Sequence, residues 1–382
     1  MRIGFDARWY NDSGVGTYVA ELLRALNALQ AQSEFELVVY EDPRNPVPTL
    51  DGTSVQRIPL GAGKYSPFGQ TALRQRARQD HLDTFHSPFY PIPLGISCPV
   101  VVTLHDLIPF LFRIDNPLKQ FLVKSGYRVA AARSSHIITV SQRTADDVKQ
   151  ILRVPPEKIT VIHNAVSDSH FHPRSSPVES IYLAECFGVR PPYVTVGSAH
   201  NWQTKNLTSA LRALTLAQQQ TAVKFQTVVY GPPQGLHAAG GPDRWKELNV
   251  VITGHLPAAD LGRLFRGAHL LLFPSLYEGF GLTILEAMSC ACAVITSTAG
   301  SLPEVAGDGA QKFDPLDLNG MANAAACLLS NPDELSVWQA RALKRSADFS
   351  WSKAAQETLS VYDRAVRQGT GHSLPAETFA RQ

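Results

Sequence analysis

The feature that most constrains the fold is the alternation of short apolar runs with amphipathic segments along almost the whole chain of 382 residues. The apolar runs are rich in Val, Ile and Leu, as strands buried on both faces of a parallel sheet are. Between them, apolar residues recur with the period of a helix. A chain that alternates in this way forms a parallel sheet with helices on both faces, so we expect an α/β fold.

A first series of this kind occupies the N-terminal half. Its predicted strands are residues 3–6, 36–40, 54–58, 84–86, 100–105, 136–140 and 159–163. Its predicted helices are residues 15–29, 67–79, 117–132 and 141–151. The last helix opens at Ser141, whose hydroxyl can accept a hydrogen bond from the free backbone N–H groups of the first turn.

Residues 164–175 (NAVSDSHFHPRS) interrupt the pattern with polar residues and turn formers, which is typical of a linker. In the second series the predicted strands are residues 193–196, 226–230, 250–253, 270–274, 293–297 and 311–313. The predicted helices are residues 178–187, 205–218, 258–267, 282–289, 319–329, 332–346 and 351–367. Because one core stops growing near 250–300 residues, we predict two Rossmann-like domains, 1–168 and 176–350, then a helix over 351–368 and a flexible tail over 369–382.

Composition excludes several classes of protein. Lys and Arg together number 35 against 33 Asp and Glu, so no global field favours nucleic acid as a partner. The apolar runs are too short to span a bilayer, and the N-terminus lacks the pattern of a secretion signal, so we expect a cytoplasmic protein. The five cysteines match no disulfide framework and no zinc spacing, so we expect no metal site.

A strand, a glycine turn and a helix follow one another in residues 273–287 (FPSLYEGFGLTILEA). The turn contains Gly279 and Gly281, and the helix begins near Leu282. Backbone N–H groups at a helix start attract anions, and glycine lets a ligand approach closely. We therefore expect the amides of Phe280, Gly281 and Leu282 to face a phosphate or sugar oxygen.

Two carboxylates flank this turn, Glu278 before the helix and Glu286 within it. Thr283 and Glu286 share one helix face because they are three residues apart. Ionised carboxylates accept hydrogen bonds from vicinal hydroxyls, as on a ribose or a hexose. A glutamate near a helix start also complements the helix dipole, but two of them around a Gly-aromatic-Gly turn favour a sugar site.

The run from Glu278 to Ala287, together with Ala299-Gly-Ser-Leu-Pro-Glu-Val and Gly307, resembles the nucleotide-sugar site of the retaining glycosyltransferases of family 4, which have the GT-B fold. Further motifs stand in the family's order: Gly14-Val15-Gly16, His105-Asp106, Ser141, His163-Asn164 and Lys205-Asn206. Phe85-His86-Ser87-Pro88 and Leu104-His105-Asp106-Leu107 look most similar to the mannosyltransferase-like branch.

The resemblance implies two Rossmann-like domains that face each other across a cleft, with the last helix crossing back to the first domain. It implies transfer of a hexose, mannose from GDP-mannose as the first expectation, to a glycan or a lipid-linked acceptor. In the second domain it implies that Glu286 binds the ribose, Glu278 the hexose and Lys205 the diphosphate. Gly279 and Thr283 complete this predicted donor site.

In the first domain, the resemblance implies that the loop Gly14-Val15-Gly16 closes over the donor phosphates. His105 is expected to act on the sugar hydroxyls or at the reacting centre, with Asp106 in a supporting role. The sequence contains no Asp-x-Asp pair for a divalent metal. Lys205 and the helix start are therefore expected to neutralise the diphosphate without a metal.

The sequence departs from the family in one respect. Many members carry an arginine just after the strand glycine or just before the lysine, whereas Ser198 and Thr204 stand there in this chain. We expect either Lys205 to act with less help or another cation, Arg8 or Arg143, to compensate.

Basic and apolar residues interleave in residues 113–133, among them Lys119, Lys124 and Phe121. A basic amphipathic helix can lie on an anionic membrane, where a lipid-linked acceptor would be found, which would make the protein peripheral to the membrane. An ordinary solvated helix face explains the same pattern.

Three alternatives remain open at this point. A catalytically silent relative that acts as a binding or scaffold subunit would share these motifs, and so would a transferase that uses a UDP-sugar. A dinucleotide oxidoreductase is disfavoured, because no Gly-x-Gly-x-x-Gly with an acidic residue about twenty positions further on follows a strand.

Overall fold

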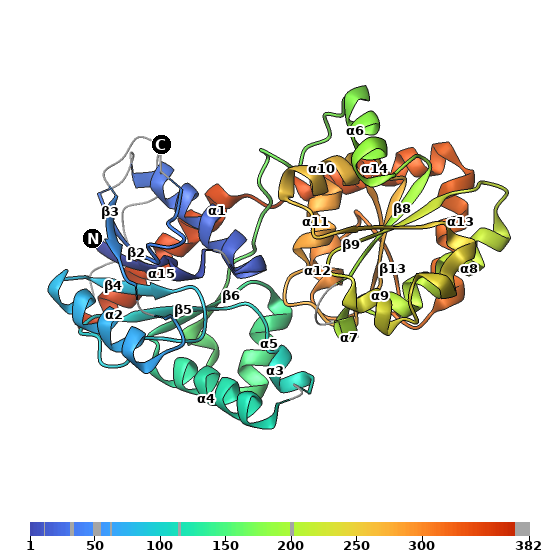
Figure 1. Cartoon of the computed structure of the whole chain (residues 1–382). Helices are drawn as coiled ribbons and strands as arrows, with labels where there is room; N and C mark the ends of the chain where they lie inside the picture. Colours follow the sequence, from blue (N-terminus) through green and yellow to red (C-terminus); the bar gives the residue numbers. More distant parts are fainter. Residues whose placement is uncertain are drawn as a thin grey trace. The chain divides into compact units, whose positions relative to one another are not determined.

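The computed structural model describes residues 1–10, 12–30, 34–48, 55–61, 63–113, 116–198 and 202–370. The chain divides into two compact units. One consists of Met1–Asn164 together with the chain from Trp351 onward, and the other of Ala165–Ser350. Each unit is a parallel sheet covered by helices (Figure 1). The predicted tail lies outside the described residues beyond position 370.

The first unit contains a seven-stranded sheet in the order β3-β2-β1-β4-β5-β6-β7, with every pair of neighbours parallel. Its strands are β1 (Arg2–Asp6), β2 (Glu36–Glu41), β3 (Gln56–Pro59), β4 (Thr84–Ser87), β5 (Val100–Leu104), β6 (His136–Thr139) and β7 (Ile159–Val161). The central strands β1, β4, β5 and β6 are almost entirely buried. Burial on both faces explains the apolar run of β5, whereas β4 buries Thr84, His86 and Ser87 as well as Phe85.

The helices of the first unit include one from the far end of the sequence. They are α1 (Ser13–Gln30), α2 (Pro67–Gln79), α3 (Ile108–Leu111), α4 (Pro117–Arg133), α5 (Gln142–Ile151) and α15 (Trp351–Thr370). Two 3-10 helices, Ala7–Trp9 and Pro156–Lys158, complete the unit. Ser141 caps α5 as predicted, because its side chain accepts a hydrogen bond from the backbone N–H of Thr144.

The second unit contains a six-stranded parallel sheet in the order β10-β9-β8-β11-β12-β13. Its strands are β8 (Tyr193–Gly197), β9 (Gln226–Tyr230), β10 (Val250–Gly254), β11 (Leu270–Phe273), β12 (Ala293–Ser297) and β13 (Gln311–Phe313). Because β8 and β11 are central, the loops that follow them meet at the middle of the sheet's carboxyl edge.

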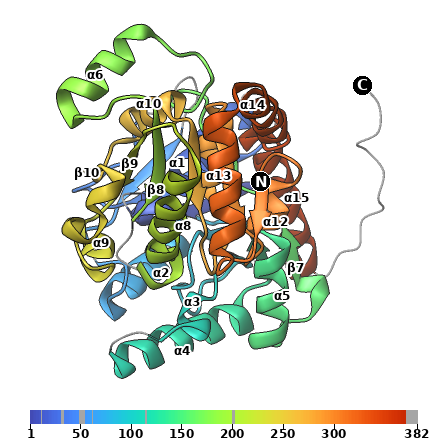
Figure 2. The same ribbon diagram turned by 90° about the vertical axis from the view of Figure 1, so that its right-hand side faces the viewer.

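The helices of the second unit are α6 (Pro177–Phe187), α7 (Trp202–Lys205), α8 (Leu207–Gln220), α9 (Gln234–Ala238), α10 (Ala258–Gly267), α11 (Leu282–Ser289), α12 (Leu302–Ala306), α13 (Leu318–Ser330) and α14 (Pro332–Ser346), with a 3-10 helix at Pro242–Leu248. Helices α8 and α13 lie side by side (Figure 2), and their buried faces share one apolar core with the sheet. Among the described residues, no helix has the length and apolar character that a membrane span requires.

The predicted start of the helix over 205–218 is wrong. Lys205 ends the short α7, and α8 begins only at Leu207. Asn206 separates the two helices because it adopts a left-handed conformation, with φ 53°. The predicted strand end at 163 is also two residues too long, since β7 ends at Val161.

A buried polar chain anchors α15 to the first sheet. The ring of His86 on β4 lies between the Tyr362 hydroxyl of α15, 2.6 Å from Nδ1, and the Thr103 hydroxyl of β5, 2.8 Å from Nε2. Burial lowers the pKa of His86 to about 3, so the ring is neutral and one nitrogen donates while the other accepts. This chain ties the last helix of the sequence to the middle of the first unit.

We expect Tyr362→Phe to lower the free energy of unfolding by about 1–3 kcal/mol, because it leaves one buried nitrogen of His86 without a partner. Chemical denaturation of the purified protein measures this change. Ser360→Ala is the matched control, since Ser360 is exposed on the same helix. An equal effect of both substitutions would contradict the anchoring role of the Tyr362 hydroxyl.

Candidate functional site

Charged side chains gather at the carboxyl edge of the second sheet. The Lys205 ammonium forms an ion pair with Glu278, with 2.7 Å between Nζ and Oε1. The Lys205 ammonium also lies over the Phe273 ring, 4.8 Å from its centroid. Both partners of the pair are largely shielded from solvent, with 22% and 15% of the side chains exposed. The structure therefore brings together a cation and a carboxylate that the sequence placed at one site.

Hydrogen bonds made by the residues directly before and after Lys205 hold it in this position. The Asn206 side-chain amide donates to the carbonyl of Pro274, at 3.1 Å, and to that of Pro315, at 2.8 Å. The backbone N–H of Leu276 donates to the Thr204 carbonyl at 2.7 Å. These bonds join the chain around Lys205 to the turn after β11. Residues 199–201, which precede α7, lie outside the described residues.

The turn between β11 and α11 depends on two glycines and a serine. Gly281 has φ 99°, a left-handed conformation that few residues other than glycine adopt. A Cβ on Gly300 would lie 2.8 Å from the Glu278 nitrogen, so only glycine allows this approach. The buried Ser301 hydroxyl donates to the carbonyls of Glu278, at 3.0 Å, and Phe280, at 2.7 Å. The loop after β12 thus fixes the turn that carries Glu278.

The N-terminus of α11 faces this edge. Leu282 and Thr283 are its first residues, so their backbone N–H groups have no acceptor within the helix. Phe280 is buried and its ring packs against Phe349 at 5.8 Å, so its side chain supports the turn from the interior. Such a helix start can hold a phosphate or sugar oxygen.

Glu286 is the second carboxyl of the site, one turn inside α11. Burial raises the pKa of Glu286 to about 7, and the nearby Lys205 charge only partly offsets this effect. The carboxyl is therefore poised between its neutral and ionised forms near neutral pH. Groups shifted in this way gather at functional sites.

In the first unit, His105 lies just after β5. Its Nε2 donates to the Pro88 carbonyl at 2.9 Å, and its ring contacts the edge of Tyr18 at 4.8 Å. Burial lowers the pKa of His105 to about 4, although the bond to Pro88 opposes this shift. The ring is neutral at pH 7, so Nδ1 is left as the acceptor for a hydroxyl.

The other predicted residues of the first unit have structural contacts. The Asp106 carboxylate accepts from the backbone N–H of Ile108 at 2.9 Å and so supports the start of α3. Gly14 and Val15 lie in the first turn of α1, and the Gly16 N–H donates to the Asp12 carbonyl at 2.6 Å. A Cβ on Gly14 would meet nothing within 4 Å, so packing in this unit does not require glycine there.

Neither suggested substitute for the family's arginine is a free cation. Arg8 is buried and makes two hydrogen bonds to the Asp6 carboxylate, both at 2.7 Å. Arg143 forms an ion pair with Asp147 at 3.1 Å. Of the three cations considered, Lys205 is the one that lies beside Glu278 and acts on Glu286.

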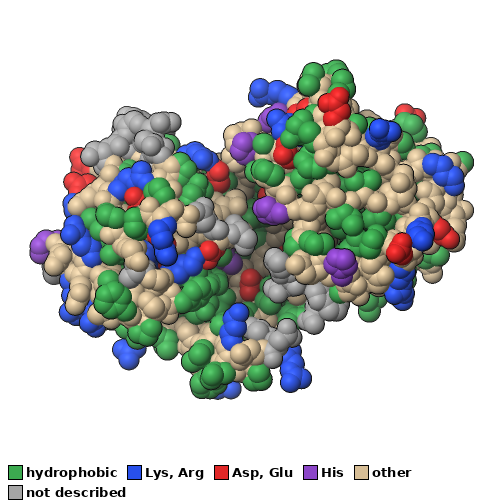
Figure 3. Space-filling model, in the orientation of Figure 1, with side chains coloured by type: hydrophobic (Ala, Val, Ile, Leu, Met, Phe, Trp, Pro, Cys, Tyr) green, Lys and Arg blue, Asp and Glu red, His purple; other side chains and the backbone are tan. Residues whose placement is uncertain are grey.

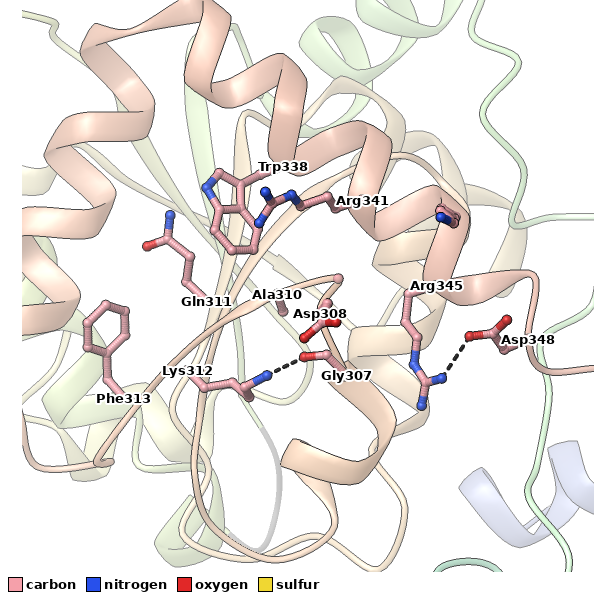
Figure 4. Close-up of a pocket in the computed structure, with 12 residues that line it drawn as sticks. Gly307, Asp308, Ala310, Gln311, Lys312, Phe313, Trp338, Arg341, Arg345 and Asp348 are labelled. Atoms are coloured by element: carbon pink, nitrogen blue, oxygen red, sulfur yellow. Dashed lines mark hydrogen bonds and ion pairs between the residues drawn. The ribbon is translucent and has the colours of Figure 1, made fainter.

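A separate cavity of about 860 Å³ in the second unit contains none of the predicted site residues. It lies between α14 and the chain around β13 (Figure 4). Two of its cations serve the fold: Arg345 donates to the carbonyls of Glu304 and Val305, and Lys312 donates to that of Gly307. These carbonyls end α12, so both side chains cap a helix. Within the described residues, no group of three His, Cys, Asp or Glu side chains is arranged to hold a metal ion.

Two family models match the chain. Residues 13–170 match the model described as "Glycosyltransferase Family 4", and residues 190–331 match "Glycosyl transferases group 1". Among similar proteins, the O-antigen chain mannosyltransferase B of Escherichia coli is 26% identical, over 92% of this chain and 96% of its own length. The MMP alpha-(1->4)-mannosyltransferase of Mycolicibacterium hassiacum is 30% identical, over 70% of this chain and 66% of its own.

Solved structures share the architecture. The crystal structure of Anabaena Alr3699/HepE in complex with UDP-glucose superimposes with a TM-score of 0.71 at 19% identity. The match covers 95% of this chain and 100% of the other. At this identity the likeness establishes the fold.

We expect Glu286→Gln to be more stable than the wild-type protein at pH 8, by about 1–3 kcal/mol, with the gap closing at pH 4.5. Because the pKa of Glu286 is raised in the folded state, wild-type stability falls as pH rises from about 4.5 to about 7. The glutamine variant does not lose stability over this pH range, because its side chain does not titrate. Unfolding midpoints measured across the pH range test the expectation.

Glu185→Gln is the control, because Glu185 is exposed on α6. A gap between Glu286→Gln and the wild-type protein that does not change with pH would show that Glu286 is not a buried, titrating carboxyl.

Proposed function

The chain belongs to the group 1 glycosyltransferases of family 4, retaining enzymes that take a sugar from a nucleotide sugar, and we propose that it transfers mannose from GDP-mannose to a glycan or a lipid-linked acceptor. Its two parallel α/β sheets have the GT-B architecture. The observation that supports a nucleotide-sugar site is the Lys205–Glu278 pair beside Glu286 at the carboxyl edge of the second sheet.

We assign the donor site to these three side chains and the start of α11. Without donor, Glu278 neutralises Lys205. A bound diphosphate carries more negative charge than one carboxylate, so it competes for the Lys205 ammonium. Glu278 is then released to accept hydrogen bonds from the hexose, while Glu286 accepts from the ribose diol. Lys205 and the amides of α11 stabilise the leaving diphosphate, which requires no metal ion.

We propose a front-face displacement for the chemical step, because it retains configuration without a covalent nucleophile. The bond between the sugar C1 and the phosphate oxygen breaks, and a bond from C1 to the acceptor oxygen forms on the same face. The proton of the acceptor hydroxyl passes to the leaving phosphate. The first unit contributes His105, whose Nδ1 can accept from a sugar hydroxyl, and the Gly14-Val15-Gly16 loop over the phosphates.

The names of relatives support mannose as the transferred sugar. Both relatives described above are named mannosyltransferases, whereas the structural neighbour binds UDP-glucose. A UDP-sugar is therefore the second candidate donor. A protein that binds a nucleotide but transfers nothing would be a silent relative with a binding role.

Helix α4 supports a membrane-borne acceptor. Leu118, Phe121 and Leu122 lie on one face of it and are 67%, 64% and 59% exposed. Lys124 and Arg128 lie over the ring of Phe110, at 5.5 and 5.3 Å. Figure 3 shows hydrophobic side chains with Lys and Arg among them at the surface of the first unit, over α4. We propose that this face binds an anionic membrane, since apolar insertion and charge attraction act together there.

We expect GDP to raise the thermal unfolding midpoint more than UDP or ADP does, and GDP-mannose to be consumed by the purified protein. Glu286→Ala should weaken nucleotide binding by about 10–100-fold, because it removes a charged hydrogen-bond acceptor. Thermal shift and calorimetric titration measure both effects. Glu185→Ala is the control, since it removes an exposed carboxyl of the same unit.

Failure of every nucleotide to bind would overturn the donor site. If the protein prefers UDP, the proposed donor becomes a UDP-sugar, and the assignment of the donor-site residues is unchanged. Binding without transfer or hydrolysis of any nucleotide sugar would indicate the silent relative instead.

We expect the wild-type protein to cosediment with vesicles that contain phosphatidylglycerol, and Phe121→Ser with Leu122→Ser to reduce the bound fraction at least about tenfold. Salt should weaken binding, because part of the attraction is electrostatic. Val178→Ser with Ile181→Ser is the control pair, since these α6 side chains are 68% and 57% exposed. Equal sedimentation of the two double variants would contradict docking through α4.

A further inference from the structure

Tyr230, the last residue of β9, has a buried hydroxyl without a hydrogen-bond partner in the described part of the chain. The side chain is 9% exposed. A phenol hydroxyl left unpaired in the interior is destabilising, so buried hydroxyls are normally paired. The second unit offers a direct contrast: the buried Tyr193 hydroxyl donates to the Leu264 carbonyl at 2.7 Å.

The Tyr230 hydroxyl lies at the same strand edge as the proposed donor site. Tyr230 pairs in register with Gly197, the last residue of β8. A Cβ on Gly197 would lie 3.0 Å from this hydroxyl and 3.4 Å from the Phe273 ring. Phe273 is the ring over which the Lys205 ammonium lies. The hydroxyl thus crosses the end of β8 toward the cluster of Lys205 and the two glutamates.

Both carboxylates act electrostatically on this phenol. Burial raises the pKa of Tyr230 far above its ordinary value, and the charge of Glu286, followed by that of Cys292 and Glu278, raises it further. The phenol therefore stays protonated and can serve as a donor. The Glu286 side chain makes no hydrogen bond within the described residues. Among the described residues, a donor without an acceptor and an acceptor without a donor thus lie at one edge of the sheet.

We propose that Tyr230 is a positioning residue for Glu286: with donor bound, its hydroxyl donates to the Glu286 carboxylate and holds it toward the ribose. This inference rests on the proposed function. The ribose diol needs an ionised carboxylate as its acceptor, and a hydrogen bond from the phenol stabilises that ionised form. The hydroxyl is itself buried, so it acts through Glu286 and not on the sugar.

Tyr230→Phe tests this role, because it removes only the oxygen. We expect the KM for the nucleotide sugar to rise about tenfold, with kcat within about twofold of the wild-type value. The unfolding midpoint should stay equal or rise, since no partner is lost. Tyr193→Phe is the matched control: it should lower the unfolding midpoint and leave the donor KM unchanged.

Two further readouts separate positioning from a structural effect. Donor affinity of the wild-type protein should weaken as pH falls through about 7, where Glu286 takes up a proton. In Tyr230→Phe this pH dependence should be smaller, because the complex has lost the bond that favours the ionised carboxyl. In a Glu286→Ala background, Tyr230→Phe should have no further effect on donor binding.

An unchanged donor KM and pH profile in Tyr230→Phe would overturn the inference while the donor site stands. Equal effects of Tyr230→Phe in the wild-type and Glu286→Ala backgrounds would also overturn it, because the hydroxyl would then act independently of Glu286. Absence of nucleotide binding by the wild-type protein would overturn both this inference and the proposed function.

Discussion

The ion pair between Lys205 and Glu278 is the interaction on which the candidate site depends. It joins the chain after β8 to the turn after β11. The side chain of Asn206, next to Lys205, donates to the Pro274 carbonyl, and the Ser301 hydroxyl donates to the Glu278 carbonyl. A half-buried cation without a partner would be costly, so the carboxylate stabilises Lys205 in the absence of a ligand. The site is therefore organised before a ligand arrives.

Much of the fold could be predicted because central parallel strands are continuously apolar. The runs at β9 and β12 have the predicted bounds. Strand order could not be predicted, since it depends on packing between distant segments. The spacing of Glu278 and Glu286 predicted the candidate site of the second unit. The break at Asn206 could not be predicted, because it depends on a backbone conformation stabilised by the carbonyls of Pro274 and Pro315.

The same limit applies to Tyr230, which looks from the sequence like any other apolar strand end. That its hydroxyl has no partner among the described residues becomes evident only when β9 and β8 are placed side by side, with β11 next to β8. Three features that are uncommon in a protein interior lie at this edge: a carboxyl that resists ionisation, a phenol without a partner in the described part of the chain, and a glycine in a left-handed conformation. The buried hydroxyls of Tyr193 and Tyr362, by contrast, are paired. Natural proteins depart from optimal packing in this way at functional sites.

The first unit is built from two separate stretches of the chain, so its parts are made at different times during translation. Its sheet is complete by Val161, but α15, which packs on α1 and anchors His86, is made last. During translation the second unit, a single continuous segment, is finished before the first. Until α15 is made, the part of the first sheet on which it packs, at β4, β5 and β6, stays uncovered beside α1, and a chain that stops short of Trp351 never covers it.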